Sequence, residues 1–243
     1  MHKIILVCFL GISLIACGTA GKKPVKAVDK LAFAGELLTF SEEINGRPES
    51  NVRMIIVDGY LRIDDGPQSE DYLLFDRTSK IIYNIVAEDK TILVMDAQDN
   101  DEQKKLKAPF PILWNVISQT SHVLMRTNDE NATSATYYQL KLNQKDCYNL
   151  VAIDQGMEKP LAALREYRQA LANQLKTQYI PQKGRACYEA VNIFTPLNHL
   201  VQGFPVREWS AYGYQRFLAD YRKMIIFPER LFELPEGYKR VDI

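Results

Sequence analysis

The residues that could do chemistry are few, and the cysteines come first among them. Cys17 ends an apolar run, Ile4–Ala16, that follows a short basic head. At thirteen residues the run is too short for a hydrocarbon core, which needs about 20, but it suits the apolar part of a signal peptide. A thiol placed directly after the small residue Ala16 is a nucleophile at the membrane surface.

The tract around this cysteine, Leu14–Gly18 (LIACG), resembles the lipobox of bacterial lipoproteins. The resemblance implies that residues 1–16 are removed as a signal peptide and that Cys17 is lipidated. Several acyl chains together anchor a protein stably, at about 0.8 kcal/mol per buried CH2. A plain secretory signal or an uncleaved core helix is the alternative. Gly18, where inner-membrane lipoproteins of enteric bacteria carry Asp, favours the periplasmic face of the outer membrane.

Two further cysteines, Cys147 and Cys187, remain after Cys8 leaves with the signal and Cys17 is lipidated. An even pair in an oxidising compartment predicts a disulfide bond. It would close a loop of about 40 residues, for which the chain-entropy model gives about 4 kcal/mol. Two buried free thiols are the alternative.

The rest of the sequence gives little support for catalysis. His122 and His199 are far apart and have no Cys or His at ligand spacing, and no common catalytic or phosphate-binding motif occurs. Asp64-Asp65 and Asp99–Glu102 lie in turn-like segments, where we expect solvated carboxylates. We therefore expect no enzyme, no metal and no cofactor. Thirty basic residues balance thirty acidic ones, which gives no support to nucleic-acid binding.

The elements predicted after the signal form a tether and one domain. Residues 17–30 predict a lipidated cysteine with a flexible tether, and residues 31–243 predict a single β-rich domain. Asn45-Gly46 and Asp58-Gly59 are strong hairpin signals, and short connections join antiparallel neighbours. The predicted strands are Leu31–Ser41, Asn51–Val57, Tyr60–Asp64, Tyr72–Asp76, Ile81–Ala87, Thr91–Asp96, Ser121–Thr127, Thr136–Leu142, Cys147–Ile153, Arg185–Phe194, Val206–Ala211 and Tyr214–Ile226.

One long helix is predicted from Leu161 to about Tyr179, from its apolar stripe at helical spacing. The stripe is either packed on the sheet or exposed to a partner or lipid. Short helices are predicted at Ile112–Ser118 and Thr195–Val201, and a loop at Ala97–Ala108. The fold class is therefore mainly β (α+β), a curled antiparallel sheet or unclosed β-barrel with one long and one or two short helices.

Aromatic residues gather on the predicted strands. If the sheet curls, Trp209, Phe217 and Tyr221 are the candidates for the wall of an apolar ligand-binding cleft. Ordinary packing is the alternative, because aromatic residues favour strands in any case.

Several segments resemble the LolA/LolB-like superfamily of periplasmic lipoprotein carriers and its uncharacterised relatives. They are Tyr60–Asp64, Leu74–Arg77, Ile81–Ile85, Thr91–Met95 and Phe232–Tyr238. The resemblance implies an unclosed β-barrel whose helices plug a hydrophobic cavity that holds acyl chains in the characterised carriers. No functional residue of a carrier matches a position of this chain. The cysteine pair and the long helix depart from the carriers' usual layout.

Together these features predict an envelope-anchored, non-enzymatic lipoprotein held to the membrane by its acyl chains. The expected ligand is a lipid or another hydrophobic molecule in a half-barrel cleft. The alternative is a structural or assembly lipoprotein that binds a protein partner in the cell envelope, through a sheet edge or face.

Overall fold

The computed structural model describes residues 32–98, 106–125 and 133–243, which lie in the compact unit Leu31–Ile243. Parts of the sequence predictions lie outside these ranges. They are the signal peptide (1–16), the lipidated Cys17 with its tether, Leu31 at the start of the first predicted strand, the acidic tract Asp99–Glu102 with most of its loop, and the end of the strand predicted at Ser121–Thr127.

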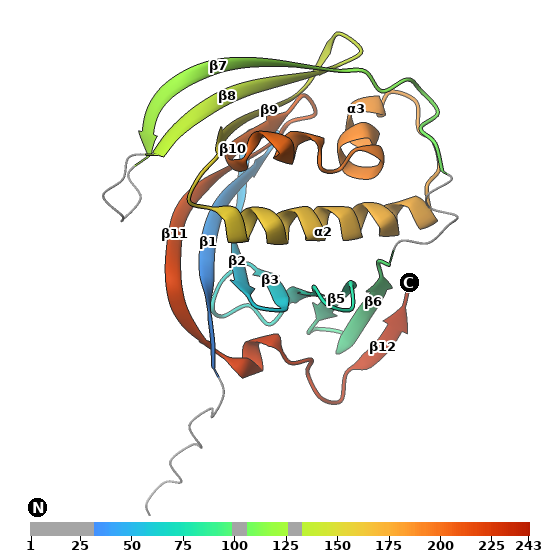
Figure 1. The fold of residues 1–243 in the computed structure, drawn as a ribbon. Helices are drawn as coiled ribbons and strands as arrows, with labels where there is room; N and C mark the ends of the chain where they lie inside the picture. Colours follow the sequence, from blue (N-terminus) through green and yellow to red (C-terminus); the bar gives the residue numbers. More distant parts are fainter. Residues whose placement is uncertain (1–31, 99–105, 126–132) are drawn as a thin grey trace, which may run out of the picture. The chain divides into compact units, whose positions relative to one another are not determined.

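A single unclosed sheet of twelve strands confirms the mainly β fold class (Figure 1). Its strands are β1 (Ala32–Ile44), β2 (Arg47–Val57), β3 (Tyr60–Asp64), β4 (Tyr72–Asp76), β5 (Ile81–Val86), β6 (Thr91–Asp96), β7 (Trp114–Met125), β8 (Thr133–Leu142), β9 (Lys145–Ile153), β10 (Phe204–Ser210), β11 (Tyr214–Pro228) and β12 (Lys239–Asp242). They lie in the order β12-β6-β5-β4-β3-β2-β1-β11-β10-β9-β8-β7. Among these strands every pair of neighbours is antiparallel except β12 and β6.

The predicted meander is present from β1 to β6, because each strand pairs with the next one along the chain. At the β1–β2 turn, Asn45 and Gly46 both have positive φ, 51° and 76°. That is the backbone of the mirror-image turn that matches the twist of a hairpin and that Asn-Gly favours. The local sequence therefore determined this half of the sheet.

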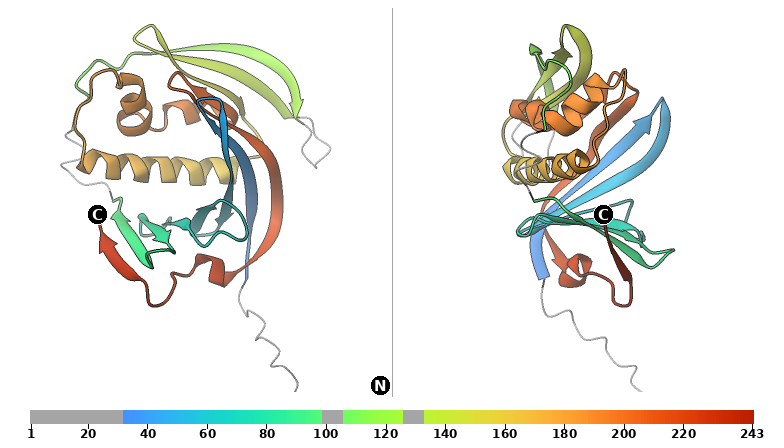
Figure 2. Two further views of the ribbon diagram at one scale, coloured as in Figure 1. Left: turned by 180° about the vertical axis from the view of Figure 1, so that it is seen from behind. Right: turned by 90° about the vertical axis from the view of Figure 1, so that its right-hand side faces the viewer.

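The two halves of the sheet join where β1 pairs with β11, the longest strand. This contact brings together residues from opposite ends of the domain. Figure 2 shows both strands bending strongly, so that the sheet curls around its helices. The concave side, which the helices cover, is called the inner face, and the opposite side the outer face.

The long helix α2 (Glu158–Thr177) lies on the inner face, as its apolar stripe predicted. Ala163, Leu164 and Ala170 are buried in the main core, and Leu161 and Tyr167 pack against it. From the sheet the same core receives Leu38, Phe40, Phe75 and Phe204, among others. Packing on the sheet, rather than exposure to a partner, therefore accounts for the stripe.

The helix predicted at Ile112–Ser118 is wrong, because this segment runs into strand β7, which pairs with β8. The β-branched residues Val116 and Ile117 favour an extended chain. Trp114 fixes the strand's beginning: its Nε1 donates to Thr195 Oγ1 at 3.1 Å.

The strand predicted at Arg185–Phe194 is also wrong. Helix α3 (Ala186–Glu189) continues there into a π-helical turn, Ala190–Phe194. One apolar cluster joins this segment to β8 and β9, and the segment contributes Ala186, Cys187, Ala190 and Val191. These four positions have the spacing of one face of a helix. A further short helix is present as predicted, although it spans Asn198–Gln202 rather than Thr195–Val201.

The chain's last segment covers the outer face of the meander. A third apolar cluster there contains Ile55, Leu74, Ile85 and Phe232, among others. Beyond Phe232 the chain reaches β12, which pairs in parallel with β6 at the sheet edge (Figure 1). Strand β12 was not predicted from the sequence, and neither was the one parallel pair among the described strands.

Candidate functional site

Two neighbouring cavities lie between the inner face of the sheet and its helices. One, of about 360 Å³, is bordered by β1, α2, the α3 region and the β10–β11 hairpin. The other, of about 370 Å³, is bordered mainly by β1 to β4. Both are lined by Met54, Tyr167 and Arg216, so they meet at these residues. We call the two together the inner cleft.

An ion pair between Glu208 and Arg216 lies in the wall of the inner cleft. The two residues are directly opposite each other on β10 and β11, and 3% and 8% of their surfaces are exposed. Arg216 Nε lies 2.5 Å from Glu208 Oε1, but its N–H does not point at that oxygen. Glu208 Oε2 is buried and has no hydrogen-bond partner in the described structure. The pair is therefore close but incompletely satisfied.

Tyrosines make up much of the rest of the wall, among them Tyr148, Tyr167, Tyr188, Tyr212 and Tyr214. Burial, followed by the negative charge of Glu208, raises the pKa of Tyr148 well above its ordinary value. Burial is also the main cause that raises the pKa values of Tyr167, Tyr212 and Tyr214. The raised pKa values keep these four side chains neutral near pH 7. All the tyrosines of the wall combine an apolar ring with a polar tip.

His199 lies behind this wall, its ring centroid 5.2 Å from that of Tyr148. Burial lowers its pKa well below the ordinary value, and the positive charges of Arg168 and Arg216 lower it further. The imidazole is therefore neutral at physiological pH. It does not line either cavity of the inner cleft, and its buried Nδ1 has no hydrogen-bond partner in the described structure.

The three aromatic residues predicted to form a cleft wall do not share one face. Trp209 stacks on Tyr137 on the outer face, at 5.8 Å between ring centroids. Phe217 is 48% exposed there, opposite Ser41. Tyr221 packs against the inner core, and its hydroxyl donates to Glu36 Oε2 at 2.7 Å. None of the three lines the inner cleft.

The predicted disulfide is present between Cys147, on β9, and Cys187, in α3, with 5.5 Å between their Cα atoms. It ties the α3 region to the sheet beside the inner cleft. The other residue with predicted chemistry, Cys17, lies outside the described ranges, and lipidation remains a prediction.

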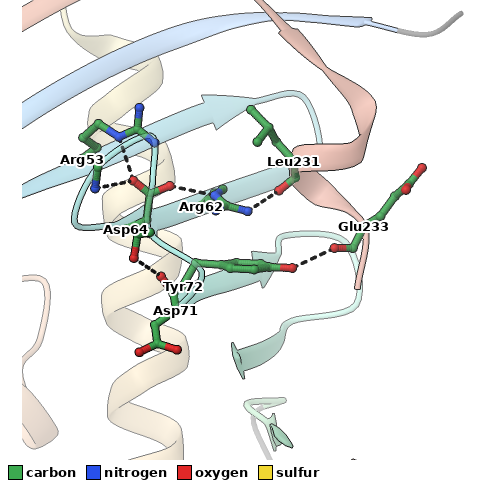
Figure 3. A network of polar contacts seen from close by, with 9 residues as sticks. Arg53, Arg62, Asp64, Asp71, Tyr72, Leu231 and Glu233 are labelled. Carbon is green, nitrogen blue, oxygen red and sulfur yellow. Dashed lines mark hydrogen bonds and ion pairs between the residues drawn. The ribbon is translucent and has the colours of Figure 1, made fainter. Parts of the chain in front are cut away.

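A buried polar cluster on β2 to β4, next to the second cavity, whose lining includes Asp64 and Tyr72, corrects the expectation that Asp64 is solvated (Figure 3). The Asp64 side chain is 0% exposed and accepts from Arg53 Nε at 2.7 Å and from Arg62 Nε at 2.8 Å. Arg62 Nη1 also donates to the carbonyl of Leu231 at 2.8 Å, in the segment that leads to β12. This cluster, called the Asp64 clamp, holds the last segment of the chain to the meander.

Tyr72 completes the Asp64 clamp. Its ring lies 3.7 Å from Arg62 Cζ, and its hydroxyl donates to the carbonyl of Glu233 at 2.9 Å (Figure 3). Arginine over an aromatic face gains a cation–π attraction. The polar groups of the clamp thus bind one another and the chain's own last segment, which indicates a structural role.

Other binding chemistry is sparse in the described part of the chain. No three His, Cys, Asp or Glu side chains among residues 32–98, 106–125 and 133–243 are grouped so that they could hold a metal ion. Within the same ranges, no helix has both the length and the apolar character needed to cross a bilayer.

Comparison with known proteins gives distant structural likeness and nothing more. No protein-family model matches the chain, and no curated protein matches it. The structure of PNGF-II in the C2 space group has a TM-score of 0.41 and 8% identity, covering 86% of this chain and 31% of that one. The structure of the same protein in space group P21 has a TM-score of 0.42 and 7% identity, covering 86% of this chain and 32% of that one. An uncharacterised conserved protein from Thermus thermophilus has a TM-score of 0.40 and 8% identity, covering 86% of this chain and 91% of that one.

This chain therefore spans about a third of the length of PNGF-II, at 31% and 32%. At these identities and TM-scores, neither a family nor a function transfers.

Proposed function

We propose that the chain is a lipid-anchored protein of the bacterial envelope that binds an amphipathic ligand in the inner cleft and catalyses no reaction. The observation that carries the binding proposal is the meeting of two cavities on the covered inner face. Each has a volume near the lower end of the range for small-molecule sites, about 300–1,000 Å³. Their walls combine apolar side chains with tyrosine rings that have polar tips.

Binding of a dansyl-labelled long-chain fatty acid to the full chain tests this proposal. Ile44 lines the cleft and is 39% exposed, so the variant Ile44→Glu is expected to fold. A charge there should weaken binding by at least about tenfold, because an apolar contact worth about 1.5–3 kcal/mol is lost.

The matched control for this experiment is Phe217→Glu, which places the same charge on the outer face. It should leave the affinity of the probe unchanged. Equal weakening by both variants would show that the probe does not bind in the inner cleft. If the wild-type chain is folded and binds no probe, the proposal is wrong.

The membrane anchor rests on the tract that ends in Cys17. Replacing Cys17 with serine removes the thiol that would receive diacylglycerol, and this should abolish metabolic labelling with palmitate. Retained labelling of the Cys17→Ser chain would contradict lipidation at this residue.

The alternative function, binding of a protein partner, is favoured by one observation at the sheet edge. Strand β7 is an open edge, and Trp114–Met125 contains no charged residue. Leu113, just before it, is 68% exposed, and Ile117 is 44% exposed. Soluble proteins usually protect such edges with charges, because free backbone groups can pair with another strand. If the inner cleft binds no ligand, this edge becomes the better candidate.

A further inference from the structure

The charges in the inner cleft are unevenly distributed between its two cavities. The cavity beside α3 is lined by two guanidinium groups, Arg168 and Arg216, and by one carboxylate, Glu208. The cavity beside the meander shares Arg216 but is lined by Glu42, Asp65 and Asp71, among others. A negatively charged ligand group would therefore be favoured beside α3 and repelled at the other end.

The guanidinium of Arg216 has hydrogen-bond donors that no residue in the described ranges uses. Its Nε contacts Glu208 without a well-aligned hydrogen bond, and the side chain donates none to any residue in the described ranges. Its Cζ lies 4.6 Å from the Phe40 ring centroid, so one side of the guanidinium is covered by an apolar face. Leaving the donors of a buried charged group unused costs free energy, and a bound acceptor would recover it.

Arg168 brings a second positive charge to the same cavity from α2. It donates to the carbonyl of Val191 at 3.5 Å and to Asn192 Oδ1 at 3.0 Å, both of them neutral acceptors. No ion pair links Arg168 to an acidic residue of the described chain. Among the residues that line the cavity beside α3, two arginines therefore face one carboxylate, that of Glu208. Glu42 adds a second negative charge near Arg216, but it lines the neighbouring cavity.

The remaining lining of this cavity offers an apolar surface. Ile44, Met54 and Leu164 contribute carbon side chains next to the arginines. Across Met54, the second cavity continues over Val52, Ile63 and Leu73. A hydrocarbon chain could thus extend from the arginines along the inner face of β1 to β4.

From this arrangement we infer that the ligand is an amphiphile with one anionic oxyanion head, a carboxylate or a phosphate, held by Arg168 and Arg216 beside α3. The inference rests on the proposed function, since it specifies the ligand class of the same cleft. Glu208, directly opposite Arg216 on the neighbouring strand, holds the guanidinium in place.

Two dansyl-labelled probes with the same hydrocarbon chain, a fatty acid and its uncharged primary amide, test the inference on the full chain held in an amphipathic polymer. The wild type should bind the acid about tenfold more tightly than the amide, as expected for a charge-assisted hydrogen bond. A lysophosphatidic acid should compete with the labelled acid, because its phosphate offers the same chemistry.

Arg216→Gln and Arg168→Gln should each reduce the preference for the acid to about twofold or less, with little change in binding of the amide. The matched control is Arg165→Gln, also on α2, whose Nη2 donates to the carbonyl of Leu200 at 2.7 Å and which lines a different cavity. It should keep the full preference. If Arg216→Gln does not fold, Arg168→Gln decides, because its side chain is only partly buried.

The outcomes separate this inference from the proposed function. Equal binding of acid and amide to the wild type would overturn the anionic head and leave the cleft as a binding site. Displacement of the probe by inorganic phosphate as effectively as by the lysophosphatidic acid would overturn the amphiphile. If the wild type bound neither the acid nor the amide, the proposed function itself would be overturned.

Discussion

Replacing Asp64 with asparagine is expected to lower the free energy of unfolding by about 3–5 kcal/mol. The substitution keeps the size of the side chain but removes the charge that balances Arg53 and Arg62. The side chain of Arg62 is only 7% exposed, so its charge would remain buried without a counter-ion. Urea unfolding of the full chain, followed by tryptophan fluorescence, measures the change.

The matched control is Asp220→Asn. Asp220 accepts from Arg222 Nε at 2.7 Å, the same distance as in the Asp64 clamp, but the two side chains are 38% and 60% exposed. Exposed ion pairs contribute about 0–1 kcal/mol, so this variant should be nearly neutral. Equal, small effects of the two substitutions would show that the clamp does not stabilise the fold. Hydrogen exchange should also show that Asp64→Asn exposes residues 231–242 first.

Removing the disulfide bond is the second substitution with a large expected effect. The double variant Cys147→Ala/Cys187→Ala should lower the free energy of unfolding by about 2–4 kcal/mol, because the closed loop restricts the unfolded chain. The bond closes a loop with a sequence separation of 40 residues. Residual structure in the unfolded state would bring the value toward the lower end.

Thiol tagging of the denatured protein checks that the bond exists in the cell. Without reductant, neither Cys147 nor Cys187 should react, and after reduction both should. Two reactive thiols before reduction would contradict the bond. A double variant as stable as the wild type would show that the bond does not restrict the unfolded state as expected.

The parts of the fold that were predictable from sequence are those determined by local signals. Asn45-Gly46 and Asp58-Gly59 specify hairpins within a few residues, and the stripe of α2 repeats at helical spacing. The pairing of β1 with β11 depends on residues nearly two hundred positions apart, such as Ala32 and Pro228, and no local pattern encodes it. The same holds for β12, whose parallel partner β6 lies far earlier in the chain.

The α3 region, residues 185–194, has sequence features of both a helix and a strand, and the strand prediction was wrong. Apolar residues at 186, 187, 190, 191 and 194 fit a helix, but the segment's β-branched and aromatic residues suggested a strand. The disulfide and the packing of Ala190 and Val191 against β9 decide for the helix.

One irregularity in β11 made it impossible to predict from the sequence which of its side chains point to the inner face. Thr39 pairs with Asp220, and the next residue, Phe40, pairs with Leu218, so one extra residue of β11 forms a bulge. A bulge reverses the alternation of side chains beyond it. Phe217 therefore points to the outer face and Tyr221 to the inner one, although strict alternation would place them together.

The pairing of Glu208 with Arg216 was not predictable from the expected turn. A two-residue turn at Tyr212-Gly213 would place Glu208 opposite Phe217, whereas the observed register places it opposite Arg216. Their burial was not predictable, because it depends on the helices that cover the inner face.

Photo-crosslinking tests the central claim, that the inner cleft holds an amphipathic ligand, most directly. The full chain would be irradiated with a fatty acid that carries a photoreactive group in its hydrocarbon chain, and the labelled residues would be mapped by mass spectrometry. We predict labels on the residues that line the inner cleft, such as Met54, Tyr167 and Tyr188. Labels confined to Trp209 and Phe217 on the outer face or to the edge strand β7, or no label at all, would contradict it.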